Sequence, residues 1–432
     1  MQTRELRTSM KRSERAGGTP HVAVIGLGYI GLPTAAVLAA GGADVTGMDV
    51  NPRTIDFVNR GEVPFVEPDL GTVLAGAVSQ GRLRATSEVP AADAYIVAVP
   101  TPFAENHNPD LSYIRAAAES IAPQLTGGEL VILESTSPPG ATEHMADVIL
   151  EARSDLTLEP NRPNTVYFAH CPERVLPGRI IVELSTNDRI IGSLNGDAGE
   201  RARDLYRLFC DGEFHITDAR TAEMAKLVEN AYRDVNIAFA NELSVVASKL
   251  NVDVWELIDL ANHHPRVNIL QPGPGVGGHC IAVDPWFLVS AAPEETPLIR
   301  TAREVNDDKP EFVLNQVVPK AQRFKEPRVA VLGLAFKPDI DDLRESPAMY
   351  IAQTLADRLS EGTILAVEPN IDELPASLAE KGNVELTDLE TAVQTADIVL
   401  LLVDHSEFKN YDQRRLQSTI VYDTRGTWRT LL

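Results

Sequence analysis

Short apolar runs alternate with longer amphipathic segments through the first half of the chain. Four such runs occupy residues 21–28, 45–49, 94–99 and 130–133. Runs of this length, rich in valine and isoleucine and ended by glycine or polar residues, indicate strands buried in a parallel sheet. Helical patterning lies between them, first at about 31–40, and this alternation predicts a doubly wound α/β fold. Strands near 166–169 and 189–191 are expected to extend the sheet.

The pattern changes in the middle of the chain. From Ala219 to Leu250 there is neither glycine nor proline, and helix-forming residues dominate. A helix of that length exceeds the usual globular size, so we expect it to span between domains and to pack against another helix, from this chain or a second subunit. Helical patterning resumes at 254–262, and a loop rich in proline and glycine follows at 271–278.

A second α/β unit begins near Arg328. The segment 329–335 repeats the character of 22–28, and 398–403 repeats that of 94–99. The sequence therefore predicts two Rossmann-like domains joined by a helical middle domain with a long central helix. The predicted divisions are a disordered basic tail at 1–20, an N-terminal domain at 21–215, a central dimerisation domain at 216–325 and a C-terminal domain at 326–432.

Charge and cysteine content narrow the classes of function. The 432 residues include 39 basic and 62 acidic side chains, a net charge of −23 that argues against nucleic acid and anionic membranes as partners. Three widely spaced cysteines suit a reducing cytoplasm better than a disulfide framework, and no pair has zinc-ligand spacing. The apolar runs are too short to span a membrane, and the basic tail has no apolar stretch typical of a signal peptide.

The first glycine turn carries the clearest chemical signal. Gly26, Gly28 and Gly31 fit the dinucleotide fingerprint, in which glycines allow a tight turn, close approach of a pyrophosphate and close helix–strand packing. Asp49 stands 18 residues beyond Gly31, at the end of the next predicted strand. A carboxylate there accepts hydrogen bonds from ribose hydroxyls and repels a 2′-phosphate, which favours NAD over NADP. The alternative is a strand–helix turn without a ligand.

Two further groups of residues are candidates for catalysis. Cys280 follows two glycines and His279, so a ligand could approach its thiol closely. The alternative is a buried structural cysteine. Lys226 and Asn230 are four residues apart and share one face of the long helix. Together they could stabilise an oxyanion, or they could belong to a solvated helix face.

Several motifs, in order, resemble the nucleotide-sugar 6-dehydrogenase family from about residue 20 to the C-terminus. They are the glycine turn at 26–31, Cys-Pro-Glu-Arg-Val-Leu-Pro-Gly at 171–178, His264–Pro272, the segment 273–287 around Gly-Gly-His-Cys, Phe-Lys-Pro at 336–338 and Arg-Glu-Ser-Pro at 344–347. The resemblance implies a four-electron oxidation of a sugar primary alcohol to a carboxylate, with two NAD reduced. It also implies that Cys280 captures the aldehyde as a thiohemiacetal, which becomes a thioester and is hydrolysed.

The resemblance assigns roles by matching position. Lys226 and Asn230 would stabilise oxyanions, Asp284 would assist proton transfer, Glu173 would act in hydrolysis and Thr136 would hold the catalytic water. Lys337 would bind the sugar nucleotide, Arg266 would reach it across a dimer interface and Arg344 would touch the cofactor. The remaining matched positions are Tyr29, Ile30, Arg53 and Thr101 for NAD, and Arg174, Gly277 and Phe336 for the substrate. For Lys226, Arg266, Lys337 and Arg344 the alternative is a surface cation.

Two departures bear on the substrate. The UDP-glucose branch has serine before the nucleophile and a second glutamate in the Pro-Glu motif, where this chain has His279 and Pro177. Both changes favour a UDP-N-acetylhexosamine, and overall motif likeness favours the manno over the gluco epimer at C2, although no residue that reads C2 is identified. A non-catalytic NAD-binding sensor or scaffold is the alternative of another class.

The resemblance also implies an arrangement for the whole chain. The site is expected in the cleft between the two α/β domains of a homodimer or higher homo-oligomer. The acidic protein could hold a dianionic UDP group if Lys337 and Arg266 converge on it.

Overall fold

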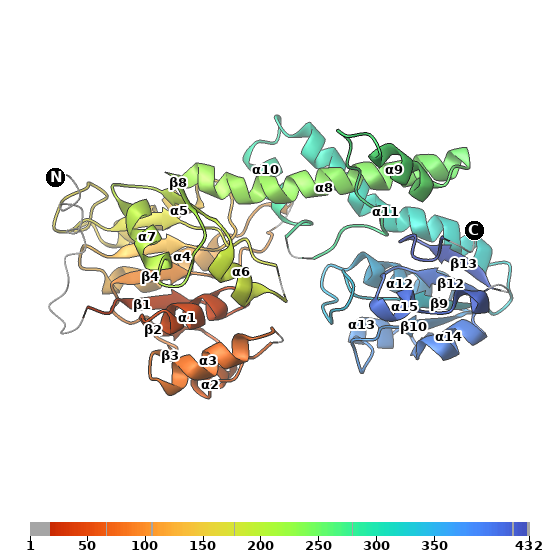
Figure 1. Cartoon of the computed structure of the whole chain (residues 1–432), viewed down its shortest axis with the longest axis horizontal. Coiled ribbons are helices and arrows are strands. Elements are labelled where there is room, and N and C mark those ends of the chain that lie inside the picture. The colour runs from red at the N-terminus through yellow and green to blue at the C-terminus, as the bar shows by residue number, and fades with distance from the viewer. Residues whose placement is uncertain are drawn as a thin grey trace. The chain divides into compact units, whose positions relative to one another are not determined.

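The computed structural model describes residues 18–65, 67–104, 107–176, 178–278, 280–416 and 419–429. The chain divides into two compact units, one ending at Leu227 and the other beginning at Val228. Each unit contains a mostly or wholly parallel sheet with helices packed on it, which confirms the predicted α/β fold (Figure 1). Apart from residues 18–20, the predicted basic tail lies outside the described residues.

The first unit is built on a sheet that, within the described residues, has eight strands in the order β3-β2-β1-β4-β5-β6-β7-β8. Neighbouring strands are parallel except at the β6–β7 pair, which is antiparallel. The strands are β1 (His21–Ile25), β2 (Asp44–Met48), β3 (Leu83–Thr86), β4 (Ala94–Val97), β5 (Leu130–Leu133), β6 (Tyr167–His170), β7 (Arg189–Ser193) and β8 (Phe214–Asp218). The chain moves outward from β1 in one direction and then returns to β4, so β1 and β4 flank the topological switch point.

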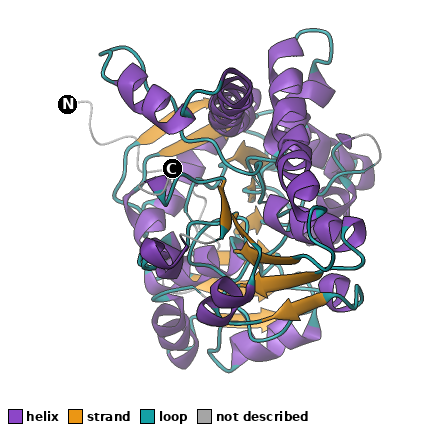
Figure 2. Cartoon of the chain, turned by 90° about the vertical axis from the view of Figure 1, so that its right-hand side faces the viewer, coloured by secondary structure: helices purple, strands orange, loops and turns teal. Residues whose placement is uncertain are grey.

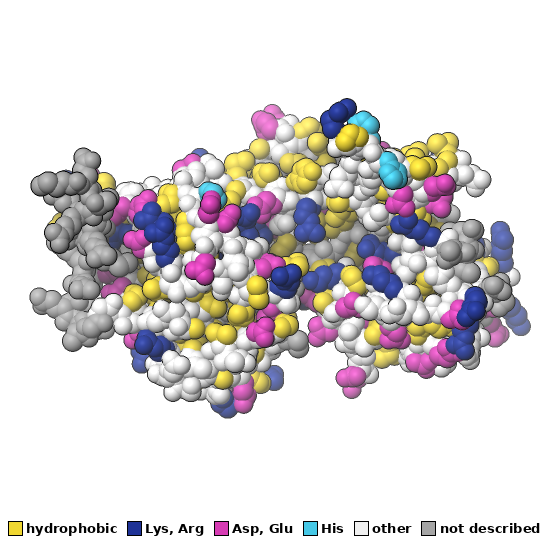
Figure 3. Space-filling view, viewed as in Figure 1, with side chains coloured by type: hydrophobic (Ala, Val, Ile, Leu, Met, Phe, Trp, Pro, Cys, Tyr) yellow, Lys and Arg dark blue, Asp and Glu magenta, His cyan; other side chains and the backbone are white. Residues whose placement is uncertain are grey.

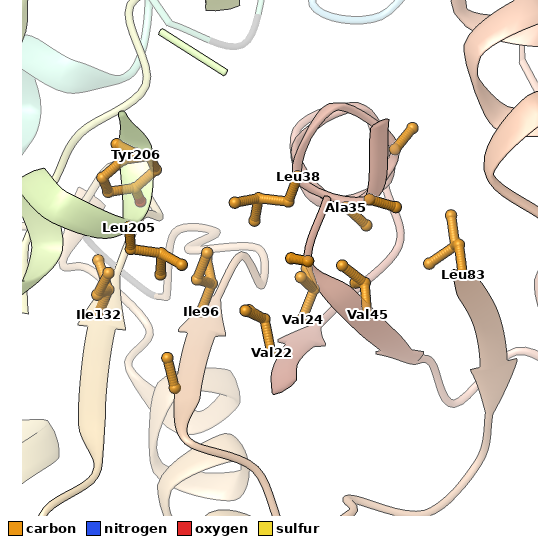
Figure 4. Packing of buried hydrophobic residues seen from close by; sticks show 14 of the residues in the cluster. Val22, Val24, Ala35, Leu38, Val45, Leu83, Ile96, Ile132, Leu205 and Tyr206 are labelled. Carbon is orange, nitrogen blue, oxygen red and sulfur yellow. The ribbon is translucent and has the colours of Figure 1, made fainter. Parts of the chain in front are cut away.

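Helices cover both faces of this sheet. They are α1 (Gly31–Ala40), α2 (Pro52–Asn59), α3 (Leu70–Ser79), α4 (Ser112–Ile121), η2 (Ala122–Gln124), α5 (Ala141–Ala152), α6 (Ile180–Thr186) and α7 (Ala198–Tyr206). The core on one face joins α1 to the sheet, where Leu38 faces Val24 and Ile96, and Tyr206 lies over Ile132 (Figure 4). The alternating side chains Ala23, Ile25 and Tyr95 belong to the core of the opposite face. Burial on both faces explains why these strands are apolar at every position.

A single helix, α8 (Ala219–Leu250), runs across the boundary between the units, with the bounds predicted from the sequence (Figure 1). The second unit continues with α9 (Val254–Asn262), α10 (Asp284–Ala291) and α11 (Pro297–Ala321). Its α8 and α11 segments are joined by buried polar side chains. The Arg303 guanidinium pairs with the Asp234 carboxylate at 2.5 Å. The side-chain amide of Asn306 donates to the same carboxylate at 2.8 Å.

The second sheet has, in the described part of the chain, five parallel strands in the order β11-β10-β9-β12-β13. Its strands are β9 (Arg328–Leu332), β10 (Thr363–Val367), β11 (Val384–Leu386), β12 (Ile398–Leu401) and β13 (Ile420–Asp423). Its helices are α12 (Pro347–Arg358), α13 (Ala376–Ala379), α14 (Leu389–Thr395), α15 (Ser406–Lys409) and η3 (Gln413–Leu416). Strands and flanking helices are distinguished by colour in Figure 2. The similarity between the sequences of the two glycine turns thus reflects the same strand order in the two sheets around β1 and β9.

The described residues have three further properties. None of the helices there is both long and apolar enough to cross a membrane. Acidic and basic side chains are interspersed on the face seen in Figure 3. Of the three cysteines, Cys171 and Cys210 are buried and Cys280 is exposed.

Candidate functional site

The turn after β1 has the geometry that a dinucleotide requires. Gly26 adopts φ +93°, a left-handed conformation that glycine tolerates best. A Cβ on Gly31 would lie 1.9 Å from the Gly26 carbonyl oxygen, so only glycine allows α1 to start so close to the turn. A Cβ on Gly28 would meet no described atom within 4 Å, which leaves its backbone open to a ligand. The three glycines therefore have the separate backbone geometries that the fingerprint requires.

Asp49 lies directly after β2 and faces this turn. Its carboxylate accepts hydrogen bonds from the backbone N–H groups of Leu27, at 2.9 Å, and Asn51, at 2.8 Å. The side chain is partly exposed, so oxygen lone pairs remain available for the hydroxyls of a ribose. Arg53, near the start of α2, is exposed. These residues fit an NAD adenosine end.

Other predicted cofactor residues lie in the turn itself and after β4 and β5. Tyr29 stacks on Phe65 with ring centroids 4.2 Å apart, and Ile30 precedes the first residue of α1. The Oγ1 atom of Thr101 is buried and has no hydrogen-bond partner among the described residues. A buried hydroxyl without a partner at the switch point is consistent with a bound cofactor that provides its hydrogen bond. Thr136 is partly buried, in the loop after β5.

Glu173 stands in a buried charged cluster after β6. One carboxylate oxygen accepts from the Arg174 backbone N–H at 2.6 Å, and the other pairs with the Arg189 guanidinium at 3.2 Å. Arg189 also lies over the ring of Tyr206, 4.6 Å from its centroid. Arg174 itself is partly exposed and reaches the Asp188 carbonyl at 3.4 Å. Sequence reasoning missed Arg189, which no recognisable spacing connects to Glu173.

Two other groups in this cluster are shifted by burial. Burial, together with the nearby Glu173 carboxylate, raises the pKa of Glu134 to about 8, although Arg189 opposes the shift. Burial raises the pKa of the Cys171 thiol to about 12, and the side chain is fully enclosed. Cys171 therefore belongs to the buried cluster, where the Arg189 guanidinium lies 3.7 Å from its sulfur.

The candidate nucleophile has two predicted partners nearby in the second unit. Cys280 is exposed, and its carbonyl accepts from the backbone N–H of Asp284 at 2.8 Å, where α10 begins. The buried Asp284 carboxylate accepts from the Asn230 side-chain amide at 2.5 Å. The structure thus brings Cys280, Asp284 and Asn230 together. Lys226, one turn earlier on α8, is half-buried and belongs to the first unit.

The glycine loop before Cys280 packs on the second predicted substrate motif. A Cβ on Gly277 would lie 2.3 Å from the Glu345 carbonyl oxygen, and one on Gly278 would lie 2.9 Å from the Phe336 ring. The loop is also held at its start, where the buried Lys309 ammonium donates to the Gly273 carbonyl at 3.0 Å. Burial lowers the pKa of Lys309 to about 8.

A pocket of about 80 Å³ lies where this loop meets the carboxyl ends of β9 and β12. Its lining includes Gly275, Phe336, Lys337, Asp404 and Arg425. β9 and β12 flank the topological switch point of the second sheet, where open α/β sheets bind ligands. Lys337 and Arg425 are cations in this lining, and Arg425 pairs with the Asp404 carboxylate at 3.0 Å. The positive excess of these three side chains suits an anionic group. Arg425 was missed by sequence reasoning, although it follows the last apolar strand.

The two remaining predicted cations have no part in this pocket. Arg344 is exposed and makes a two-pronged ion pair with Asp342 at 2.8 Å. Arg266 is exposed in the loop after α9. His279 and Pro177, the positions that distinguish the chain from the UDP-glucose branch, lie outside the described residues.

Comparison with family models covers nearly the whole chain. Residues 20–210 match the NAD-binding domain of the UDP-glucose/GDP-mannose dehydrogenase family, residues 220–308 its central domain and residues 330–430 its UDP-binding domain. The first match confirms NAD as the predicted cofactor, and the three together confirm the predicted nucleotide-sugar dehydrogenase family.

Named relatives agree with these models. The chain is 58% identical to an NDP-N-acetyl-D-galactosaminuronic acid dehydrogenase of Ralstonia nicotianae, over 94% of this chain and 96% of the relative. It is 54% identical to the UDP-N-acetyl-D-mannosamine dehydrogenase of Salmonella typhimurium, over 94% and 99%. A solved UDP-N-acetyl-mannosamine dehydrogenase from Staphylococcus aureus superposes with a TM-score of 0.83 at 41% identity, over 94% and 95%. The chain belongs to the UDP-glucose/GDP-mannose dehydrogenase family.

Proposed function

We propose that this enzyme oxidises UDP-N-acetyl-D-mannosamine to UDP-N-acetyl-D-mannosaminuronate, a precursor for surface polysaccharide, with two NAD per sugar. The observation that carries the chemistry is the grouping of an exposed Cys280 with Asp284 and Asn230 at the end of a glycine loop. The loop also borders the pocket that holds Lys337 and Arg425. A thiol, a proton carrier, an amide donor and an anion-binding pocket are the groups that this reaction needs.

The reaction requires one covalent intermediate on the protein. Loss of a hydride and the hydroxyl proton converts the primary alcohol to an aldehyde. The Cys280 sulfur then adds to the aldehyde carbon, and the carbonyl oxygen takes up a proton. Loss of a second hydride and of the thiohemiacetal hydroxyl proton leaves a thioester. Attack by water then releases the carboxylate, a proton and the Cys280 thiol. NAD, when bound, accepts the hydride in both oxidation steps.

Asn230 and Asp284 of the second unit take roles that their contacts support, and the first-unit residues take the roles of the motif positions that they match. Asn230 donates to Asp284 and so orients its carboxylate, which is placed to carry protons beside Cys280. Lys226 would stabilise the oxyanions, while Glu173 and Thr136 would direct the hydrolytic water. Lys337 and Arg425 would neutralise the diphosphate. Arg266 would reach the bound sugar nucleotide across the dimer interface, and Arg344 would contact the cofactor.

The relatives of this chain support two candidate sugars. The likeness to UDP-N-acetyl-D-mannosamine dehydrogenases at 52–54% identity supports the manno sugar. The 58% identity to Ralstonia enzymes named for N-acetyl-D-galactosaminuronic acid supports a galacto sugar as a second candidate. The gluco epimer and a non-catalytic NAD-binding role have no comparable support.

Purified protein with NAD should be tested against the UDP-linked N-acetyl derivatives of mannosamine, galactosamine and glucosamine. The proposal expects two NADH for each UDP-N-acetyl-D-mannosamine consumed and the highest kcat/KM for that sugar. It is overturned if the manno sugar gives no NADH while another sugar does. One NADH per sugar would contradict the covalent two-step scheme.

Replacing Cys280 with alanine tests the nucleophile separately. The variant should form no uronate, while its affinity for NAD stays within about twofold of wild type because the glycine turn is intact. Cys210→Ala is the matched control, since it removes a buried thiol in the other unit and should retain two NADH per sugar. Uronate formation by Cys280→Ala would refute the scheme.

We also propose the predicted three-domain division, a cytoplasmic location and a homodimer formed through α8. That helix exposes a hydrophobic stripe at spacings of four and seven residues: Val228, Tyr232, Phe239, Val246 and Leu250. Such a stripe is typical of a helix face that packs against another helix. Phe239→Glu should convert the dimer to a monomer in light scattering. A wild-type protein that is already monomeric would contradict the dimer.

A further inference from the structure

Glu223, on the second turn of α8, is almost fully buried with 1% of its surface exposed. Its carboxylate accepts three hydrogen bonds from the start of α5. The donors are the Gly140 backbone N–H at 2.6 Å, the Thr142 backbone N–H at 2.8 Å and the Thr142 hydroxyl at 2.6 Å. A side chain of one helix therefore satisfies the unpaired N–H groups at the start of another.

The start of α5 depends on this external carboxylate. Its N-cap residue is Gly140, which has no side chain and adopts φ +95°. A helix usually receives its cap from a serine, threonine, aspartate or asparagine at that position. Here Glu223 takes over that role from 83 residues away in sequence. A carboxylate only accepts hydrogen bonds, so it matches three donors without conflict.

The contact joins two segments that carry proposed catalytic residues. Thr136 lies in the loop that ends at Gly140, and Lys226 is three residues after Glu223, on the same side of α8. Any slip of α8 along α5 would change the distance between the Lys226 ammonium and the Thr136 loop. Glu223, Lys226 and Thr136 all belong to the first unit.

We propose that Glu223 is a positioning residue, which fixes the register of α8 against α5 and so holds Lys226 at a set distance from Thr136. The proposal rests on the proposed function, because it assumes that Lys226 stabilises an oxyanion and that Thr136 holds water. Glu223 touches none of the reacting atoms. Its effect on the reaction passes through the placement of Lys226.

Glu223→Gln tests the proposal with little change of shape. The amide nitrogen would face one of the three donors, so the contact with α5 should break. We expect kcat to fall at least tenfold, while KM for NAD stays within about twofold. Glu143→Gln is the matched control, because Glu143 pairs with Arg220 and joins the same two helices at the exposed surface. Its kcat should stay within twofold of wild type.

A double-variant cycle separates positioning from general destabilisation. In a Lys226→Ala background the added Glu223→Gln change should lower the rate by less than twofold, since the group it positions is gone. Single-turnover measurements with enzyme in excess keep the slow variants measurable. A full tenfold loss in that background, or a Glu223→Gln enzyme with wild-type kcat, would overturn the proposal.

Failure of the proposed function would look different. It would show as wild-type protein that oxidises none of the three N-acetylated sugar nucleotides, or that yields one NADH per sugar. The Glu223 comparison uses whichever nucleotide sugar the wild-type enzyme oxidises. Its outcome is a ratio between variants, so it does not depend on which epimer is preferred.

Discussion

The turns after the first strands of the two sheets have the same backbone hydrogen bond, yet only the turn of the first sheet fits a dinucleotide. In the first sheet the Gly26 N–H donates to the Met48 carbonyl at 2.8 Å. In the second the Gly333 N–H donates to the Val367 carbonyl at the same distance. Both glycines have φ near +92°, at +93° and +92°. The shared geometry comes from the shared order of strands, in which the chain leaves the first strand and crosses to its neighbour.

The acidic residue after the second strand repeats the likeness. Asp49 accepts from the Leu27 N–H at 2.9 Å, and Glu368 accepts from the Leu334 N–H at 2.8 Å. The two carboxylates then differ in what else surrounds them. Asp49 is partly exposed, whereas Glu368 is buried and also accepts from His405 at 3.0 Å. The second carboxylate is already satisfied by the protein.

The glycines explain the rest of the difference. Gly28 and Gly31 of the first turn correspond in order to Ala335 and Pro338 of the second. The first helix starts at Gly31, whereas the second unit inserts a loop before α12 begins at Pro347. That loop carries Lys337 into the pocket. One topology therefore serves two ligands, because the residues after the first glycine decide whether backbone or side chains face the switch point.

Gly31→Ala should have the largest effect, because it strikes the tightest contact of the first turn. The new Cβ would lie 1.9 Å from the Gly26 carbonyl oxygen, and backbone must move to admit it. We expect a loss of about 3 kcal/mol in the free energy of unfolding, measured by urea denaturation. Pro338→Ala at the matching position should change stability by less than about 1 kcal/mol. Equal losses would break the comparison.

Local features of this comparison could be predicted from sequence, because they follow from neighbouring residues. The glycine turn, Asp49 and the bounds of α8 depend on spacing and on the absence of glycine and proline. Strand ends shifted by a residue or two, since hydrogen bonds to neighbouring strands set them. The contacts of Glu223 with Gly140 and Thr142 join residues more than 80 positions apart, so no local pattern announces them.

The same reason explains the missed site residues. Arg425 lines the pocket only because β13 lies beside β12, and Arg189 reaches Glu173 only because β7 pairs with β6. The motif order indicated the family and its nucleophile. It did not indicate which cations the sheet order would bring to each ligand.

Buried carboxyls in the two units should respond oppositely to pH. Burial raises the pKa of Glu134 to about 8, so folded protein keeps a proton that unfolded protein releases above about 4.5. Wild type should therefore lose stability relative to Glu134→Gln as pH rises, by about 2–3 kcal/mol between pH 5 and 7. Urea midpoints of both proteins across that range measure the difference. A constant difference would contradict the shifted pKa.

The pKa of Glu368 is shifted in the opposite direction to that of Glu134. Burial alone would raise its pKa, but hydrogen bonds from His405 and the Leu334 and Ala335 N–H groups outweigh burial and lower it. Its stabilising effect is thus complete above the usual glutamate pKa and is lost as pH falls through the lowered value.

Glu368→Gln should cost about 2 kcal/mol of stability at pH 7, because the amide leaves one buried donor facing a nitrogen. The excess stability of wild type over this variant should shrink in acid. Asp49→Asn is the control in the first unit, and its partly exposed site should limit the loss to less than about 1 kcal/mol. Its main effect should be a weaker preference for NAD over NADP. A larger loss of stability for Asp49→Asn than for Glu368→Gln would contradict the comparison. It would mean that the protein depends more on the Asp49 carboxylate than on the Glu368 carboxylate.

Gly28→Ala should have the smallest effect on stability. It therefore separates the role of the first turn in NAD binding from its role in folding. A Cβ at Gly28 would meet no described atom within 4 Å, so the free energy of unfolding should change by less than about 0.5 kcal/mol. The methyl group would instead enter the space that a pyrophosphate needs. We expect NAD affinity, measured by calorimetry, to fall about tenfold, or ~1.4 kcal/mol. Ala335→Gly, the reverse change in the second turn, should leave NAD affinity unaltered, because that turn presents Lys337 rather than bare backbone. Unchanged NAD binding by Gly28→Ala would mean that the open backbone of the first turn is not the cofactor surface, and the contrast between the turns would then rest on Asp49 alone.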